Sequence, residues 1–173
     1  MWRNFFNTKF IGSGVFATGT IGAAYHFSGR SPVPCDSRAM LKSAVCNEPH
    51  ADKRYKGGED GWAIGADGTM IMVADGVGGW ANKGVDPGIF TKNMCKRAAQ
   101  MYAESFAGRD LKSILVEAVK QTPEKGSCTV VMASLEDDTL KTINLGDSGY
   151  IIYTDKKKVY RTTEQQHYFN CPY

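Results

Sequence analysis

Acidic residues stand beside glycines at three places in this sequence: Gly58-Glu59-Asp60-Gly61, Asp75-Gly76 and Gly146-Asp147-Ser148-Gly149. Because glycine has no side chain, it lets carbonyl oxygens and water molecules approach closely. Carboxylate and carbonyl oxygens are the ligands that the hard cations Mg²⁺, Mn²⁺ and Ca²⁺ prefer. An acid beside a glycine is also a common turn, as at Asp67-Gly68, so the pattern leaves both a metal site and a set of plain turns open.

The predicted strands around the first two acidic places bear on this choice. Apolar runs at 61–64 and 69–74 flank a turn that contains Asp67-Gly68, a pattern that predicts an antiparallel hairpin. The first strand of such a hairpin begins at the end where the second strand finishes. Asp60 and Asp75 should therefore lie at the same end of the sheet, where two carboxylates repel each other unless a cation lies between them.

The three places where an acid stands beside glycine, at 58–61, 75–76 and 146–149, are called the acid–glycine corners below. The rest of the chain predicts the helices and strands that carry them. Asp86 and Pro87 predict the start of a helix whose apolar residues recur every four positions to about residue 106. Asp110 should cap a second helix that stops before Pro123. Four short runs after residue 126 predict strands, at 128–135, 140–145, 150–153 and 158–161. Strands paired locally around two consecutive helices predict an α+β fold with antiparallel sheets and disfavour a doubly wound parallel sheet.

The N-terminal region differs from the rest in composition. Residues 1–35 contain no Asp or Glu, and they combine Arg3, Lys9 and Arg30 with hydroxylated and aromatic residues. This composition is typical of an organelle-targeting presequence. Within it, the apolar segment 11–27 is near the lower limit of a membrane span, which leaves a marginal membrane segment as the alternative. We expect residues 36–56 to form a linker and residues 57–173 to form the folded part.

Charge and cysteine content exclude other classes of function. The net charge of +3 with no Lys/Arg stripe argues against a nucleic-acid partner. The five cysteines form no Cys-x-x-Cys pair, which disfavours a zinc site or a disulfide framework and favours reduced thiols. EF-hand and P-loop motifs are absent, and the three histidines suggest no nucleophile–base pair.

Several motifs together resemble one known family. The stretches "GED", "VADGVGGW", "GSCTVV" and "NLGDSGYII", in this order and spacing, are similar to the metal-dependent protein phosphatases of type 2C, the PPM family. The stretches "DGVGGWANKGVDPGIF" and "EQQHYFNCPY" resemble the mitochondrial, PTC-seven-like branch of that family. The resemblance covers about residues 57–173.

The resemblance implies a fold, a cofactor and a reaction. The fold would be part of a four-layer α/β/β/α sandwich with two Mn²⁺ or Mg²⁺ ions between its sheets. Asp75 would bridge both ions, the carbonyl of Gly76 would bind one, Glu59 would reach the other, and Asp60 would hold metal-bound water. Asp147 would lie near an additional, weaker metal position. The reaction would be hydrolysis of phosphoserine or phosphothreonine in phosphoproteins by a metal-bridging hydroxide, at the mitochondrial matrix or inner membrane.

The sequence departs from the family pattern at three points. Val77 stands where many members carry a His after the Asp-Gly pair. The family has an Arg that binds phosphate shortly before the acidic pair. In this sequence neither Arg54 nor Lys56 stands clearly at the matching position, so both are only weak candidates. The chain ends at Tyr173, before the region that supplies two further metal-binding aspartates in the family. These departures leave open a catalytically incomplete phosphatase-like fragment or isoform that binds a partner, and also an unrelated α+β binding domain.

Overall fold

The computed structural model describes residues 14–20, 40–105, 110–136, 139–155, 157–168 and 171–172. Its centre is a four-stranded antiparallel sheet in the order β3-β4-β5-β6. The strands of this sheet are β3 (Gly61–Ile64), β4 (Met70–Gly76), β5 (Cys128–Glu136) and β6 (Thr139–Leu145). Every neighbour in this sheet is also the next strand along the chain, so short connections suffice except between β4 and β5, where the helices intervene.

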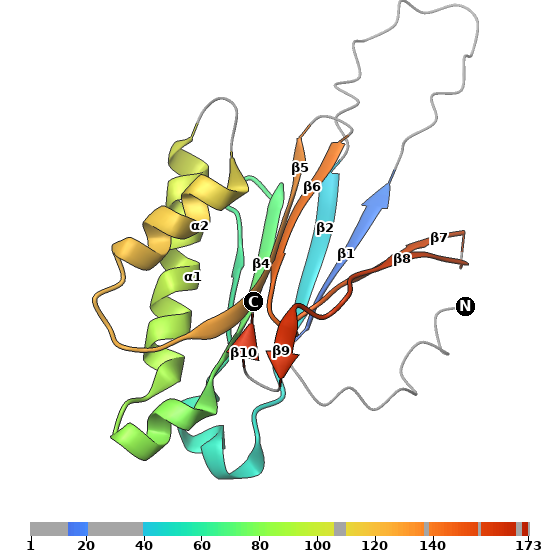
Figure 1. The fold of residues 1–173 in the computed structure, drawn as a ribbon. Coiled ribbons are helices and arrows are strands. Elements are labelled where there is room, and N and C mark those ends of the chain that lie inside the picture. The colour runs from blue at the N-terminus through green and yellow to red at the C-terminus, as the bar shows by residue number, and fades with distance from the viewer. Residues whose placement is uncertain are drawn as a thin grey trace, which may run out of the picture.

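Two α-helices form a layer on one face of this sheet, as Figure 1 shows. They are α1 (Pro87–Glu104) and α2 (Leu111–Lys120). Asp86 caps α1 by accepting from the Gly88 N–H, and Asp110 caps α2 by accepting from the N–H groups of Lys112 and Ser113. Both caps are the ones that the sequence predicts. The helix α1 packs on β3 and β4, and α2 packs on α1 and on β5 and β6.

The hydrophobic core lies between the helices and this sheet. Met70 and Met72 alternate with more accessible residues along β4 and are at most 1% exposed. Met132 on β5 and Tyr102 on α1 are fully buried beside them. Alternate strand residues and one helix face thus meet in a single apolar layer, which holds the ends of β3 and β4 in place.

Three further strand pairs complete the described fold. They are β1 (Gly14–Thr20) with β2 (Met40–Cys46), β7 (Ile151–Thr154) with β8 (Lys157–Arg161), and β9 (Gln166–Tyr168) with β10 (Cys171–Pro172). The β1 strand also contacts β4. The hairpin of β7 and β8 exposes Ile151, Tyr153 and Val159 by 43%, 62% and 64%. Two short 3-10 helices, η1 (Ala51–Lys56) and η2 (Gly78–Lys83), precede β3 and follow β4.

The predicted hairpin, helices and strand meander are confirmed, as is the α+β class with antiparallel sheets. In the described part of the linker expected at 36–56, the structure has β2 and η1. Leu41, Ser43 and Val45 alternate with exposed neighbours, which is a strand pattern of weak hydrophobicity.

The marginal membrane segment expected at 11–27 also differs from the structure. Its described part, residues 14–20, is strand β1 in antiparallel pairing with β2, and the remainder lies outside the described residues. Among the residues with a described position, we find no helix that is both long enough and apolar enough to cross a membrane.

Candidate active site

The β3–β4 hairpin brings Asp60 and Asp75 to one end of the sheet. Gly61 pairs with Ala74, so the two aspartates are the next residues outward on neighbouring strands. Asp75 in turn lies opposite Thr129 of β5. The prediction that these two carboxylates share a sheet end is therefore confirmed, and the cause is the hairpin register.

The turn after β6 brings the third acidic place to the same end. Val130, the neighbour of Thr129, pairs with Leu145 at the end of β6. The hydroxyl oxygens of Thr129 and Ser148 lie 2.5 Å apart in a hydrogen bond, which fixes the turn that holds Asp147. Gly146 has a φ of +87°, and a Cβ there would lie 2.5 Å from the Thr129 methyl carbon. This corner therefore requires a glycine.

Like charges dominate the surroundings of Asp75. Partial removal from water, followed by the negative charges of Asp60, Asp147 and Glu59, raises the pKa of Asp75 to about 6. A hydrogen bond between the Asp75 and Asp60 carboxyl groups acts in the same direction. The Asp75 side chain itself is exposed, so its carboxylate remains reachable from solvent. A positive charge placed near these carboxylates would relieve their mutual repulsion.

Gly76 is in close contact with the Glu59 backbone. A Cβ at Gly76 would collide with the Glu59 carbonyl oxygen and lie 2.8 Å from Thr91 Oγ1. Thr91 cannot move away easily, because it is fully buried and its hydroxyl donates to the Pro87 carbonyl at 2.6 Å. The glycine therefore allows the start of α1, the Glu59 backbone and the end of β4 to meet.

Glu59 has an environment opposite to that of Asp75. Its side chain is 6% exposed and forms ion pairs with Lys53 through Oε2 and with Lys56 through Oε1, the latter at 3.1 Å. Burial alone would raise the pKa of Glu59, but the hydrogen bonds and charges of the two lysines outweigh it and hold the pKa below its usual value. Both oxygens of this predicted metal ligand are thus bound by ammonium groups.

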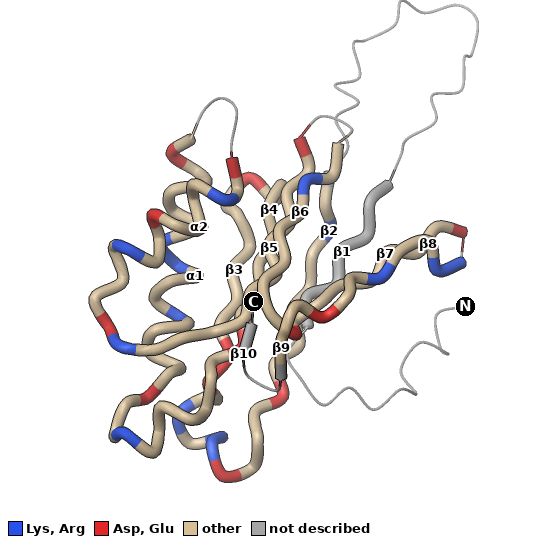
Figure 2. Tube along the Cα trace, viewed as in Figure 1, with Lys and Arg blue, Asp and Glu red and all other residues tan. Residues whose placement is uncertain are grey.

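Lys56 joins Glu59 to the first turn of α1. Its Nζ donates to Asp86 Oδ1 at 2.9 Å, and Asp86 also accepts from the Gly88 N–H at 2.9 Å. The hydrogen bond to Asp86, more than the one to Glu59, raises the pKa of Lys56 even though burial acts against it. Figure 2 shows basic and acidic residues at this end of the molecule, where η1 contains Asp52 together with Lys53, Arg54 and Lys56.

The two weak candidates for phosphate binding have other partners. The guanidinium of Arg54 donates to Glu48 Oε1 at 2.6 Å on the exposed side of η1. Lys56 is taken by Glu59 and Asp86. Lys53 was not predicted as a site residue, although it reaches Glu59. The signal for it was a pair of lysines three residues apart in the segment before an acidic pair.

The donor set of this sheet end fits a hard cation in kind and in charge. It offers carboxylate oxygens of Asp60, Asp75 and Asp147 beside the Gly76 carbonyl, and their mutual repulsion would be relieved by a divalent ion. The described side chains do not, however, contain a group of three His, Cys, Asp or Glu residues spaced closely enough to hold a metal ion. Ion binding would thus require the carboxylates to converge.

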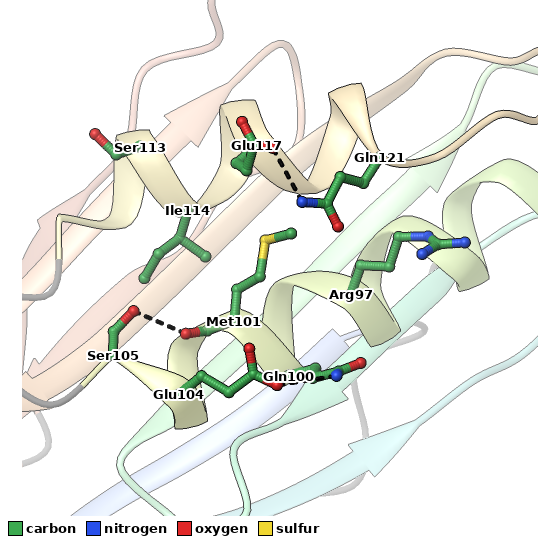
Figure 3. A pocket seen from close by; sticks show the side chains of 9 residues that line it. All are labelled: Arg97, Gln100, Met101, Glu104, Ser105, Ser113, Ile114, Glu117 and Gln121. Atoms are coloured by element: carbon green, nitrogen blue, oxygen red, sulfur yellow. Dashed lines mark hydrogen bonds between the residues drawn. The ribbon is translucent and has the colours of Figure 1, made fainter.

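A separate cleft of about 500 Å³ lies between α1 and α2, as Figure 3 shows. Ser105 donates to the Met101 carbonyl at 2.8 Å, and Gln121 donates to Glu117 at 3.0 Å. The residues that line the cleft are helix side chains: Arg97, Gln100, Met101, Glu104, Ser105, Ser113, Ile114, Glu117 and Gln121. None of them belongs to the acid–glycine corners, so this cleft is distinct from the candidate site.

Comparisons with known proteins agree on one family. The chain is 34% identical over 177 residues to "Probable protein phosphatase 2C 80" of Arabidopsis thaliana, a match that covers 96% of this chain and 43% of the plant protein. It is 35% identical over 158 residues to "Protein phosphatase PTC7 homolog fig" of Drosophila ananassae, covering 84% of this chain and 43% of the fly protein. No family model matches the chain.

The fold is also similar to a solved structure. The X-ray structure of the photosystem II phosphatase PBCP superposes with a TM-score of 0.68 at 34% sequence identity, covering 73% of this chain and 51% of that one. The chain therefore spans about half the length of the proteins that it matches. The similarity in sequence and the similarity in fold point to the same family.

Proposed function

Over the region matched, the chain belongs to the protein phosphatase 2C family, and we propose that it acts as a protein phosphatase. The reaction we propose is hydrolysis of phosphoserine and phosphothreonine in phosphoproteins. The observation that supports this most is the location of three acid–glycine corners at one sheet end, with Asp75 between the other two. A phosphate ester is itself an anion, so a reaction at this end requires positive charge to be supplied.

We propose Asp60, Asp75, the Gly76 carbonyl, Asp147 and, after release from its lysines, Glu59 as the groups that would hold Mn²⁺ or Mg²⁺. Such ions would neutralise phosphate charge and lower the pKa of the attacking water. Asp60 would accept a hydrogen bond from that water and orient it. Asp75 is reachable from solvent, so an ion can reach its carboxylate. Val77 carries no ionisable group, so the proton for the leaving alkoxide must come from water or another residue.

A second candidate is a phosphatase-like chain that binds a partner and does not catalyse. One observation favours it: both Glu59 oxygens are bound by lysines, and no metal-ligand group is formed among the side chains described. On this view the same corners would be retained for stability. The two candidates differ in whether purified chain turns over substrate.

We further propose a mitochondrial location, as the acid-free composition of residues 1–35 favours. Strand β1 lies within this segment and pairs with β2, so removal of the segment would leave β2 without that partner. Imaging of the full chain, and of a form lacking residues 1–35, each fused to a fluorescent protein, tests the location. Loss of mitochondrial signal on deletion is expected, and an unchanged distribution would contradict this proposal.

The activity is tested by phosphate release from a phosphothreonine peptide by the purified chain with Mn²⁺. We expect metal-dependent turnover that falls at least about a hundredfold in Asp75→Asn, the size of effect seen when a key electrostatic group is removed. Asp67→Asn is the matched control, because Asp67 lies in the turn at the opposite end of the same hairpin, where it accepts from the Thr69 N–H. A folded chain without turnover would support the partner-binding candidate instead.

A further inference from the structure

The Glu59 carboxylate is held by two lysines that differ in how firmly each is fixed. The Lys56 side chain is 19% exposed and bound by a second carboxylate, Asp86. The Lys53 side chain is 38% exposed, and its ammonium pairs with Glu59 through Oε2. Of the two, Lys53 is the one whose ammonium can leave Glu59 for solvent without breaking a second ion pair of the kind that Lys56 makes with Asp86.

The backbone nearby is shaped around the Lys53–Glu59 pair. A Cβ at Gly78 would lie 3.0 Å from Glu59 Oε2 and 3.2 Å from Lys53 Nζ. Gly78 begins η2 directly after the Asp75-Gly76 corner, so the ammonium occupies space beside the candidate metal site. The absence of a side chain at Gly78 is thus explained by this ion pair.

We propose that Lys53 is an internal cation for Glu59, which a divalent ion must displace before Glu59 can act as its ligand. Lys53 neutralises Glu59 at one side of the sheet end, while the charges that act on Asp75 are those of other carboxylates, Asp60, Asp147 and Glu59. An ion therefore binds first on the Asp75 side, and its binding through Glu59 competes with the Lys53 ammonium. This inference rests on the proposed function, since it concerns the same site.

Competition of this kind has a defined thermodynamic consequence. The Lys53–Glu59 contact must open when Glu59 binds an ion, so the contact lowers ion affinity by its own coupling free energy. Removing the ammonium should raise the affinity for Mn²⁺ by about tenfold, within the usual range for coupled sites. Restoring a positive charge should restore the lower affinity. Lys56 should not behave in this way, because Asp86 keeps its ammonium in place.

The test is a Mn²⁺ titration of the full chain, with free Mn²⁺ measured by electron paramagnetic resonance. We expect Lys53→Met and Lys53→Gln to bind about tenfold more tightly than the unsubstituted chain, and Lys53→Arg to bind as the unsubstituted chain does. Lys96→Met, a change of an exposed lysine on α1, is the control and should have no effect. In a Glu59→Gln background, Lys53→Met should no longer change the affinity.

The outcomes separate this inference from the proposed function. If Asp75→Asn abolishes Mn²⁺ binding but Lys53→Met and Lys53→Gln leave the affinity unchanged or lower it, the Lys53 inference alone is overturned. If the Lys53 variants bind more tightly only when Glu59 is intact, it is supported. If Asp75→Asn leaves binding intact, the proposed metal site is wrong. Absence of Mn²⁺ binding in every variant, the Lys53 variants included, overturns both.

Discussion

Carboxylates on the two sides of one sheet end have opposite electrostatic surroundings. On the side of η1, Glu59 is buried and each of its oxygens meets a lysine, so its charge is balanced without any ion. On the side of β4, Asp75 is exposed and its charged neighbours are Asp60, Asp147 and Glu59. Partial removal from water, followed by these negative charges, raises the pKa of Asp75 to about 6. Acid–glycine corners of similar sequence therefore differ: in one the carboxylate is neutralised by lysines of the chain, and in the other it faces like charges.

The largest effect is expected where the two sides touch. Gly76→Ala places a Cβ against the Glu59 carbonyl and the fixed Thr91 hydroxyl, so backbone must shift. We expect the free energy of unfolding to fall by about 2–3 kcal/mol, as in other overpacked sites, measured by urea denaturation. Gly79→Ala is the control, since a Cβ there meets nothing within 4 Å. Equal losses in the two variants would show that the sides do not depend on this contact.

On the side of Glu59, the balanced side, removal of Lys56 should lower the free energy of unfolding by less than Gly76→Ala does. Lys56→Met leaves Asp86 and one oxygen of Glu59 without their ammonium, and we expect a loss of about 1–2 kcal/mol at pH 7. The carboxylates have lowered pKa values in the folded state, so this stability exists above their unfolded pKa and disappears as the pH falls through the folded values. Urea denaturation from pH 7 down to pH 3, with Lys96→Met as control, tests this. A constant difference at all pH values would contradict it.

On the side of Asp75, the unbalanced side, removal of the carboxylate charge should raise the free energy of unfolding instead of lowering it. The pKa of Asp75 is raised from 3.8 to about 6, so ionisation of Asp75 destabilises the folded state as the pH rises through this interval. In metal-free buffer at pH 7.5, Asp75→Asn should therefore stabilise the chain, by about 1 kcal/mol once solvent screening of the exposed side chain is included. The difference should vanish below about pH 4. Destabilisation by Asp75→Asn at pH 7.5 without metal would refute the account of this side.

The smallest effect concerns the thiols beneath the sheet end. Cys128 pairs with Gly76, and burial raises its pKa to about 12; burial also raises the pKa of Cys95, whose sulfur lies near Gly61. Cys46 on β2 is exposed. In a variant with Cys35 and Cys171 changed to Ser, Ellman's reagent at pH 8 should modify only Cys46 rapidly. Rapid modification of Cys128 would show that the sheet end is open on its helix side.

The sequence predicted the side of the site that depends on local register. An Asp-Gly turn between two apolar runs determined the hairpin, and the hairpin placed Asp60 beside Asp75. The β2 strand was missed because Lys42 and Ser43 make a seven-residue strand look like a polar linker. Most of its alternate residues are only partly buried, so periodicity was a weak signal there.

The balanced side could not be predicted from spacing. Gly57 and Gly58 both have positive φ, at 74° and 76°, and these two residues reverse the chain between η1 and Glu59. Only this reversal brings Lys53 and Lys56 onto Glu59. Two consecutive glycines permit many conformations, and which one is adopted depends on contacts with α1, such as the bond from Lys92 Nζ to the Gly58 carbonyl at 3.0 Å.

The most direct test of the central claim is paramagnetic broadening by Mn²⁺ in ¹H–¹⁵N spectra of the chain. We predict that substoichiometric Mn²⁺ broadens the amide signals of Asp60, Asp75, Gly76 and Asp147 first, and that signals of α2 remain sharp until higher concentrations. Broadening that begins at the acidic residues of the α1–α2 cleft, Glu104 and Glu117, or no site-specific broadening at all, would contradict the assignment of this sheet end as the metal-dependent active site.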